Sequence, residues 1–485
     1  MRKIILAIGF AFVMGESSTW AQNEADVIRF SYTQPMGSVR TMGMGGAFGA
    51  LGADFGSASI NPAGMGVYRR GDAGATMGIY SSKTNANSLS DAAINNLGIA
   101  LVTPSIDPDM PFFTIAYTRA TTEQFAGVIS TPDMPLTASL LHTFLQSATG
   151  TPFSLLDNST EYPFTASLAW YAYLLDPDGA STDQYVTPFD TQGTVNTNYR
   201  IEESGNITDD QFSVGFTLKD IISLGATISK STITYNSNSI REEIITEAES
   251  ELASWDYSEN LNIDGSGLNI KVGGILHADW LKIGITWHSG TNYTLFDTYW
   301  YSINSYWKDG TTNYAPSMTG NYEYRLKTPQ RLLLSSAVVI GKNMILSADY
   351  EGVDYSTGLL SSSSGWASDG YAFNSENIAV QDSYVRTHQL RIGVEARINK
   401  KWRARAGSGY TTSPFSEEAE VQGDARRYST SLGCEYRMDA KYLGVAWTRS
   451  WFERDLYIAD PQLQGAPINL ANSKGMLVIG GGVRF

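Results

Sequence analysis

The strongest constraint in this sequence is a repeated alternation of apolar and polar residues. Between Arg386 and Ile398, the residues Leu390, Ile392 and Val394 share one face, while most intervening residues are polar or charged. A period of two is typical of β-strands whose two faces meet different surroundings. About fourteen such segments follow one another, at approximately 72–82, 96–103, 112–120, 209–219, 221–234, 257–276, 280–290, 320–340, 343–356, 383–398, 402–412, 424–438, 441–454 and 474–485.

The connections between these segments alternate regularly between short and long. The short ones lie near residues 104–111, 219–220, 278–279, 341–343, 399–401 and 439–440. The long ones span about 121–208, 235–256, 291–319, 357–382, 412–423 and 455–473. Short turns at one end and long loops at the other are typical of outer-membrane barrels, whereas a soluble sandwich has no reason to separate loop lengths. We therefore predict an all-β fold, a transmembrane antiparallel β-barrel of about 14 strands formed by residues 72–485.

The composition supports a membrane barrel and excludes several other classes. The chain has 485 residues, of which 17% are charged and 12% aromatic, with a net charge of −15. A chain poor in charge and rich in aromatic residues resembles an outer-membrane barrel. The acidic balance argues against a nucleic-acid partner. A single cysteine, Cys434, excludes an intrachain disulfide and a cysteine-based zinc cluster.

The N-terminus predicts export. Arg2 and Lys3 precede an apolar run over residues 4–14, and a polar stretch then ends with small residues at the −3 and −1 positions of a cut after Ala21. This is the pattern of a secretory signal peptide, here residues 1–21. No later segment is apolar over a length that could form a transmembrane helix. We predict the outer membrane of a Gram-negative bacterium.

The C-terminus fits the same location. Leu477, Ile479, Gly481, Val483 and Phe485 share one face of the last predicted strand, and the chain ends on the aromatic residue. Such an end resembles the signal read by the barrel-insertion machinery, which we expect as a partner together with outer-membrane lipids. As the edge of a soluble sheet, this apolar strand would be prone to aggregation.

A glycine-rich stretch precedes the predicted barrel. It contains Gly43, Gly45, Gly46, Gly49 and Gly52 within ten residues, and it ends with Asn61, Pro62, Ala63 and Gly64. This density of glycine disfavours both helix and strand and allows close backbone approach. A small, tightly turning segment suits a confined space. We predict that residues 22–71 form an N-terminal extension and a hatch inside the barrel lumen.

The stretch from Gly37 to Asp72 resembles the N-terminal plug of the FadL/TodX family of outer-membrane channels for hydrophobic compounds. In that family, a glycine-rich hatch with an Asn-Pro-Ala motif precedes a fourteen-stranded barrel. The resemblance implies passive uptake of long-chain fatty acids or similar molecules, with lateral release through the barrel wall. It makes Asn61 to Gly64 the expected hinge or contact point of the hatch, and Gly43, Gly45, Gly46 and Gly49 its characteristic glycines.

Two groups of loop residues have alternative interpretations. The loop over 121–208 is expected to contain apolar helices, which form either a self-packed lid or a ligand groove with Leu141, Phe144, Leu145, Trp170, Tyr173 and Leu174. Seven aromatic residues in the loop over 291–319 belong either to an interfacial girdle or extended strands, or to a ligand-facing surface: Tyr293, Phe296, Tyr299, Trp300, Tyr301, Tyr306 and Trp307.

Charged residues of the later strands are expected to face the lumen, because the lipid face disfavours them. We expect a salt-bridged ladder formed by Arg391, Glu395, Arg397, Arg403, Arg405, Glu435, Arg437 and Arg484. Alternatively, the group around Arg391, Arg405 and Glu435 contacts a substrate carboxylate, which guanidinium binds in a bidentate manner.

The sequence gives little support for catalysis. There are four histidines and no Gly-x-Ser-x-Gly elbow, and the acidic segment over 241–251 is expected to be a solvated helix. We predict no enzyme, no cofactor and no metal site. The alternatives are a haem or other apolar-ligand receptor, a structural or adhesive outer-membrane protein, and a membrane-embedded hydrolase, which would need a Ser/His or Asp/His pair on inward positions.

Overall fold

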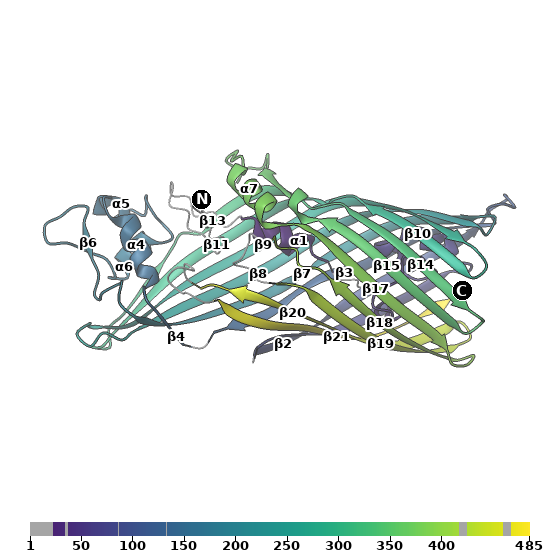
Figure 1. Cartoon of the computed structure of the whole chain (residues 1–485). Coiled ribbons are helices and arrows are strands. Elements are labelled where there is room, and N and C mark those ends of the chain that lie inside the picture. Colours follow the sequence, from purple (N-terminus) through teal and green to yellow (C-terminus); the bar gives the residue numbers. More distant parts are fainter. Residues whose placement is uncertain (1–22, 34–36, 86, 132, 417–423, 459–466) are drawn as a thin grey trace, which may run out of the picture.

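The computed structural model describes residues 23–33, 37–85, 87–131, 133–416, 424–458 and 467–485, so the predicted signal peptide lies outside the described residues. The described chain forms a closed antiparallel β-barrel of 14 strands (Figure 1). Closure occurs between the first and last strands, β1 (Asp72–Thr84) and β21 (Ile468–Arg484), which pair from Asp72 opposite Arg484 to Thr84 opposite Asn472. The predicted barrel class and strand number are confirmed.

Eight further wall strands are continuous: β2 (Asn87–Pro104), β3 (Phe112–Ser130), β7 (Val195–Leu218), β8 (Ile222–Ile245), β9 (Leu252–His277), β17 (Arg386–Arg397), β18 (Trp402–Thr411) and β19 (Arg427–Met438). A ninth continuous wall strand is β20 (Lys441–Leu456). Each of the remaining three wall strands is interrupted once and therefore carries two labels. The three pairs are β10 (Leu281–His288) and β11 (Asn292–Trp307), β13 (Gly320–Lys327) and β14 (Arg331–Ile340), and β15 (Met344–Asp354) and β16 (Leu359–Ser362). Short strands lie in the loops: β4 (Met134–Leu136), β5 (Asp176–Pro177), β6 (Tyr185–Val186) and β12 (Thr312–Pro316).

One side of the wall is much taller than sequence alternation indicated. The strands β7, β8 and β9 have 24, 24 and 26 residues, whereas β17, β18 and β19 have 12, 10 and 12. The predicted loop over 235–256 is therefore mostly strand, and the predicted acidic helix at 241–251 is wrong. The predicted loop over 291–319 likewise contains β11 and β12. Strands that extend beyond a bilayer keep their backbone pairing without an apolar outer face, so the alternation that reveals them disappears.

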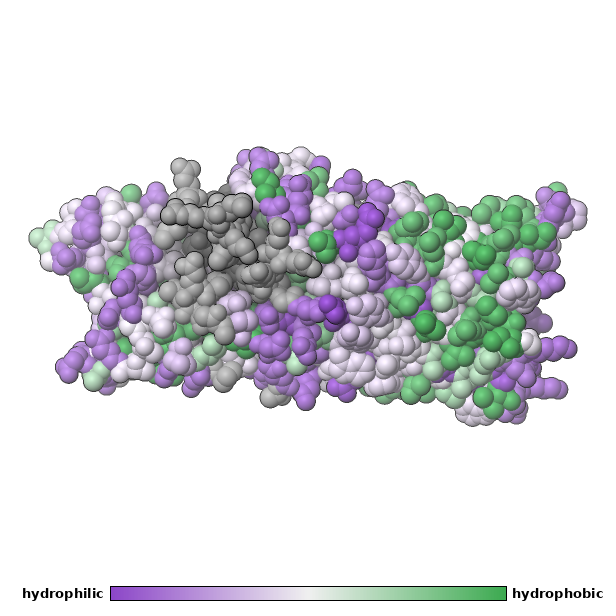
Figure 2. All heavy atoms as spheres, in the orientation of Figure 1, coloured by the Kyte–Doolittle hydropathy of each residue, from purple (hydrophilic) through white to green (hydrophobic). Residues whose placement is uncertain are grey.

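The apolar faces of the alternating strands point outward. On β17, Leu390 and Ile392 are each 46% exposed, whereas Arg391 and Glu395 between and beyond them are buried. Figure 2 shows that hydrophobic side chains gather on the outer surface toward the end of the barrel where β10, β14 and the C-terminus lie, whereas the other half is mainly polar. An apolar outer band on a closed barrel matches the hydrocarbon layer of a membrane. Within the described residues, no helix has the length and apolarity that crossing a membrane requires.

The helices lie before the first wall strand and in the long loops. Helices were predicted in the loop over 121–208, and the structure has them there. Before the barrel come α1 (Ala25–Ser31), α2 (Val39–Gly43), α3 (Ser57–Ile60) and the 3-10 helix η1 (Pro62–Val67). The loop after β3 contains α4 (Leu140–Ala148), α5 (Phe153–Asp157) and α6 (Ala166–Tyr171), which pack over the tall side of the wall (Figure 1). The loop after β16 contains α7 (Asn374–Ser383), and η2 (Tyr355–Thr357) precedes β16.

The apolar band can be tested with one substitution on its surface. Replacing Ile392 by Arg puts a charge on the lipid-facing side of β17, which should destabilise the inserted barrel by about 2–4 kcal/mol. We expect a loss of folded protein in membranes, measured as the heat-modifiable band on a gel. The control is Asn238→Arg, on the polar outer face of β8. Equal losses in both variants would show that the band is not the membrane-facing surface.

Candidate functional site

Residues 37–71, here called the N-terminal segment, contact inward-facing residues on strands from several sides of the barrel. Helix α2 packs against β18, β19, β20 and β21, and η1 packs against β3, β7, β8 and β9. Between them, the backbone N–H groups of Phe48 and Gly49 donate to the carboxylate of Asp349 on β15, at 2.9 and 3.0 Å. Almost all residues of this segment are buried. The segment therefore bridges the wall on its inner side.

The glycines of the segment allow this close packing. Gly45 has φ +64°, a left-handed conformation that favours glycine, and Gly46 follows with φ +75°. A Cβ atom on Gly49 would lie 2.0 Å from the hydroxyl oxygen of Ser335. Gly43 lies against Gly433 of β19, where an added Cβ would meet the glycine Cα at 3.1 Å. The backbone of the segment thus touches the wall directly at positions where a larger residue would not fit.

The motif from Asn61 to Gly64 links the segment to β8 and β9. The Asn61 side chain accepts a hydrogen bond from the Ala63 N–H at 3.1 Å, which caps η1, and donates to the Gly49 carbonyl at 2.6 Å and the Gly274 carbonyl at 3.4 Å. The carbonyl of Pro62 lies so close to Gly225 of β8 that a Cβ there would approach it to 2.2 Å. The carbonyl of Gly64 accepts from the Ala53 N–H at 3.0 Å. The motif is therefore a contact point between three chain segments.

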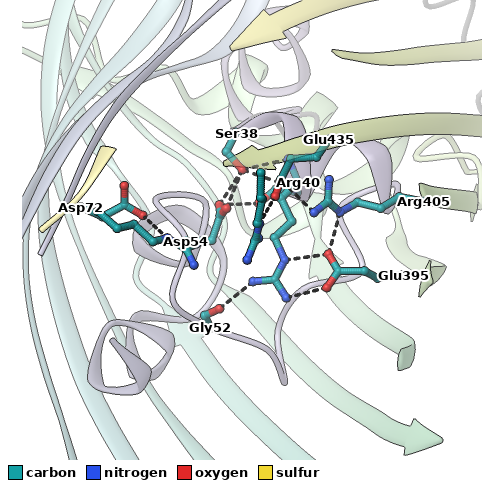
Figure 3. A network of polar contacts seen from close by, with 11 residues as sticks. Ser38, Arg40, Gly52, Asp54, Asp72, Glu395, Arg405 and Glu435 are labelled. Carbon is teal, nitrogen blue, oxygen red and sulfur yellow. Dashed lines mark hydrogen bonds and ion pairs between the residues drawn. The ribbon is translucent and has the colours of Figure 1, made fainter. Parts of the chain in front are cut away.

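An ion-pair network joins α2 to the short-strand side of the wall (Figure 3). The guanidinium of Arg40 contacts Glu395 at 2.9 Å, and Arg405 contacts Glu395 at 2.6 Å and Glu435 at 2.8 Å. Arg437 pairs with Glu435 as well. The side chains of four residues in this network are mostly buried, namely Arg40, Glu395, Arg405 and Glu435. Breaking a buried pair by removing one partner is strongly destabilising, so these contacts fix the segment against the wall.

The predicted ladder is only partly formed. Arg391 belongs to a separate group, with Glu351 at 3.0 Å and Asp349 at 3.8 Å, and Arg484 pairs with Asp72 at 3.3 Å. Arg397 and Arg403 have no ion pair among the described residues. The structure therefore brings Arg405 and Glu435 together but holds Arg391 apart from them. Arg391 lies instead beside Asp349, the carboxylate that also accepts hydrogen bonds from the N-terminal segment.

The upper lumen, on the long-loop side of the segment, is lined by aromatic and aliphatic side chains. Its buried inward-facing residues, here called the upper chamber, are Phe125, Ile207, Ile233, Tyr235, Ile263, Tyr293, Leu295, Tyr299, Tyr322, Tyr324, Leu326, Val353 and Leu360. Strand β11, which continues β10 upward, contributes Tyr293, Leu295 and Tyr299. Tyr293 and Tyr299 therefore face inward rather than toward a membrane interface. Asp297 is fully buried on the same face of β11, between Leu295 and Tyr299, so the chamber is mainly but not wholly apolar, whereas a water-filled porin has a polar lumen.

Helix α1 occupies the upper chamber, which sequence reasoning missed because seven residues show no clear period. Val27 and Phe30 are buried there, and the Phe30 ring packs edge-on against Phe125 and Tyr235 at centroid distances of 6.0 and 5.9 Å. The carboxylate of Asp26 pairs with Arg29 and accepts a hydrogen bond from the Tyr324 hydroxyl at 2.8 Å. Burial raises the pKa of Asp26, and the Arg29 charge offsets part of that effect.

A small polar cavity of about 100 Å³ lies between α1 and the N-terminal segment. Its lining includes Phe30 from α1, Ser59 from α3, and Asp209, Lys271 and Arg331 from the wall. Lys271 is 3.4 Å from Asp209, and Arg331 is 2.9 Å from Glu351, so the cations on its wall are paired. The lumen therefore changes from apolar in the upper chamber to polar just above α3.

The wall is incompletely paired beside the upper chamber. Strand β2 pairs with β3 only from Asn96–Ala120 to Pro104–Phe112, although both strands continue upward for about nine residues more. Side chains span the unpaired edges: Thr121 donates to the Ile94 carbonyl at 2.9 Å and Gln124 to the Asp91 carboxylate at 2.7 Å. We call this unpaired stretch the β2–β3 gap. Sequence alternation cannot reveal it, because it depends on which strands pair.

The loop residues proposed for a groove separate into two groups. Leu141, Phe144 and Leu174 are completely buried in the core formed by α4, α6 and the ends of the tall strands. They cannot line an open groove, and this part of the prediction is wrong, because the short helices must bury their apolar faces on each other and on Trp255. Leu145 and Trp170 are partly buried beside that core, and Tyr173 is exposed.

A serine–histidine contact exists but lacks the features of a hydrolase. The Ser223 hydroxyl lies 2.7 Å from His277 Nε2 on the neighbouring strand. Ser223 is fully buried beneath η1 and also bonds to the Thr217 hydroxyl at 2.7 Å. Among the described residues, no carboxylate hydrogen-bonds to His277, and no group of three or more metal-ligating side chains is arranged to hold a metal ion. A catalytic triad needs both an accessible nucleophile and an orienting group.

No family model matches the sequence, and no curated protein matches it. Solved structures are similar in fold. A FadL homologue of Pseudomonas aeruginosa has a TM-score of 0.55 at 14% identity, covering 94% of this chain and 100% of that one. The CymD monoaromatic hydrocarbon channel has a TM-score of 0.54 at 12% identity, covering 93% and 97%. The Pseudomonas putida toluene transporter TodX has a TM-score of 0.52 at 11% identity, covering 94% and 99%.

These similarities extend over nearly the whole barrel. The predicted resemblance to FadL/TodX channels is therefore confirmed at the level of the fold, which is that of outer-membrane β-barrel channels. The identities are too low to transfer a ligand or a binding residue from any of these proteins.

The Asn61 contacts give a direct test of the segment. Replacing Asn61 by Ala removes the hydrogen bonds to Gly49 and Gly274 and takes the side-chain donor away from the buried Gly49 carbonyl, which should weaken the docking of the segment by about 1–3 kcal/mol. We expect more frequent channel openings in planar-bilayer recordings, with normal barrel assembly. Asn304→Ala, which loses a 3.0 Å hydrogen bond to Asp256 on the outer face, is the control. Identical recordings for both variants would contradict the prediction that these contacts hold the segment in the lumen.

Proposed function

We propose that this protein is an outer-membrane channel for the passive uptake of hydrophobic small molecules, such as long-chain fatty acids, with lateral release into the bilayer. The observation that supports the proposal most is the apolar lining of the upper chamber, because a channel for polar solutes has no use for it. The similar structures include hydrocarbon and toluene channels, which is consistent with the same class of ligand.

The proposed route has three steps. A ligand enters the upper chamber from the long-loop end and displaces α1, whose Val27 and Phe30 occupy the apolar space. It does not continue downward, because the N-terminal segment and the polar cavity lie below. It leaves sideways through the β2–β3 gap, whose foot is bordered on the outside by the exposed apolar residues Met77 and Ile94. Transfer of a hydrocarbon chain into the bilayer is favourable by about 0.8 kcal/mol per methylene group.

In this proposal, residues 22–71 include the hatch and residues 72–485 form the barrel, after removal of a signal peptide over 1–21. The hatch glycines Gly43, Gly45, Gly46 and Gly49 permit close contact with the wall. The motif Asn61, Pro62, Ala63 and Gly64 holds the hatch in place. The C-terminal strand ending in Phe485 is read by the barrel-insertion machinery during assembly.

The luminal charges favour a bracing role over ligand binding. Arg405 contacts two carboxylates, and Arg391 contacts two others, so neither guanidinium is available to a substrate carboxylate without breaking a buried pair. We therefore propose that Arg391, Arg405 and Glu435 hold the hatch. Leu145, Trp170 and Tyr173 remain candidates for first contact with a ligand on the helical cap, whereas Leu141, Phe144 and Leu174 stabilise the cap.

The lateral route can be tested by cross-linking. In a Cys434→Ser background, cysteines at Asp91 and Gln124 would be joined across the β2–β3 gap by a short bis-maleimide. We expect uptake of a fluorescent fatty acid into proteoliposomes to fall to the level of protein-free vesicles, because the two edges can no longer separate. The matched control joins Thr103 to Phe113, which are already paired below the gap. Unchanged uptake in the first variant would contradict release through this gap.

Deleting residues 38–68 distinguishes a channel from an adhesive or structural barrel. The wall strands pair with one another, so we expect the shortened barrel to assemble, to admit a small polar dye that the full protein excludes, and to lose selective uptake of the fatty acid. A purely adhesive protein would show no change in either flux. A haem receptor would instead retain haem on purification, which absorbance near the Soret band would detect.

A further inference from the structure

At the short-turn end of the lumen, Arg397 and Arg403 lie below the ion-pair network and have no ion pair among the described residues, and Arg437 beside them has only a carboxylate that it shares with Arg405. In the pairing register, Arg397 of β17 lies directly opposite Arg403 of β18, and Arg403 lies opposite Glu435 of β19. Residues that face each other across antiparallel strands share one side of the sheet. Because Glu435 is buried inside the barrel, Arg403 and Arg397 also face inward, as does Arg437, two residues beyond Glu435.

The charges of this region do not balance. Arg40 and Arg405 are neutralised by Glu395 and Glu435, and within the part of the chain that the structure describes no other carboxylate makes an ion pair with the row below. Arg437 only shares Glu435 with Arg405. Arg484, the neighbouring luminal arginine, is already paired with Asp72.

Arg403 itself has no hydrogen bond or ion pair among the described residues, although its Nη1 is buried. Like charges directly opposite each other destabilise a sheet unless a counter-charge lies between them. A guanidinium presents several N–H donors in a planar fork that matches carboxylate and phosphate oxygens. Arg397 donates one long hydrogen bond, at 3.4 Å, to the Asn399 carbonyl of its own turn, and Arg437 shares Glu435 with Arg405. Together with Arg403, these two residues supply guanidinium donors that the described carboxylates do not fully satisfy.

We propose that Arg397, Arg403 and Arg437 form an oxyanion-binding site at the short-turn mouth of the barrel. The ligand presents a carboxylate or phosphate group. Two sources supply this chemistry, namely the headgroup of an anionic phospholipid in the adjoining leaflet and a soluble anion in the compartment below. The site is distinct from the proposed hydrophobic route, which leaves the lumen far above it.

The short-turn mouth beside the site carries further positive charge. Lys400 and Lys401 lie in the turn between β17 and β18, and the Lys401 ammonium lies 5.9 Å from the centre of the outward-facing Tyr436 ring, at the rim rather than in the lumen. On the outer face of the same strands, Trp402 and Tyr436 pack with ring centroids 4.9 Å apart, an aromatic pair of the kind found where a barrel meets the membrane surface. This pair places the short-turn mouth of the barrel, and the three arginines inside it, at the level of the lipid headgroups.

The test compares Arg403→Gln with Arg403→Lys and with Arg426→Gln in the full-length barrel. Arg426 is an exposed arginine paired with Asp424 in a loop at the opposite end, so it serves as the matched control. Folding of each variant is checked by heat-modifiability. Binding of inorganic phosphate is measured by titration calorimetry in an uncharged detergent. Retention of phosphatidylglycerol against phosphatidylcholine is measured by native mass spectrometry after extraction from nanodiscs.

We expect Arg403→Gln to bind the anion at least about tenfold more weakly than the natural protein, because a charge-assisted contact is lost. Arg403→Lys should retain part of the affinity, and Arg426→Gln all of it. Phosphate binding with this pattern identifies a soluble anion, whereas selective retention of phosphatidylglycerol with this pattern identifies a lipid headgroup. If both measurements are the same for the natural protein and Arg403→Gln, the proposal is wrong.

Discussion

The whole architecture depends on backbone hydrogen bonds that a bilayer cannot satisfy. In the hydrocarbon layer, an unpaired N–H or C=O group costs several kcal/mol, so a sheet that crosses it must close on itself. Here closure is made by β1 and β21, which pair over their entire shared length from Asp72 to Thr84. Every inward position of this closed wall must then be filled or solvated, and the other features of the molecule follow from how that is done.

The lumen is filled in two chemically different ways. In the lower half, the backbone of the N-terminal segment touches the wall through glycines, and buried carboxylates such as Asp349 and Glu395 bind its N–H groups and Arg40. In the upper half, aromatic and aliphatic side chains line the wall, and α1 occupies the space between them, with Phe373 and Val380 of the loop after β16 packed in the same cluster. Directional polar contacts suit a part that must stay in one position, whereas an apolar contact is easily exchanged for another apolar surface.

The sequence allowed the wall to be predicted better than its contents. Strands in the bilayer have an apolar face every second residue, and Leu390 and Ile392 show why these segments were found. The upper parts of β7 and β8 were missed because residues such as Asn198 and Asn238 need no apolar neighbours outside the membrane. Helix α1 was missed because its position is fixed by tertiary contacts with Phe125 and Tyr235 rather than by its own pattern.

The candidate site shows a similar limit. The inward direction of Arg405 and Glu435 followed from alternation, but their partners did not, because pairing depends on register between strands. The assumption that all inward charges join one ladder therefore placed Arg397 and Arg403 in a network that does not reach them. Similarly, apolar helical residues such as Leu141 look alike in a sequence whether they form a core or a groove.

In the proposed route, the boundary between the two halves of the lumen determines where a hydrophobic ligand would leave. Below the upper chamber, a ligand would have to displace buried ion pairs such as Lys271–Asp209 and Arg331–Glu351, which costs several kcal/mol for each uncompensated charge. Beside the chamber, it meets the β2–β3 gap, where the backbone bonds between the two strands are already absent and only side chains such as Gln124 and Asp91 join the edges. These few side-chain hydrogen bonds stand in place of a full backbone ladder, so separating the two edges breaks fewer hydrogen bonds here than between fully paired strands. The lateral direction is therefore favoured by the distribution of charge and pairing within the wall.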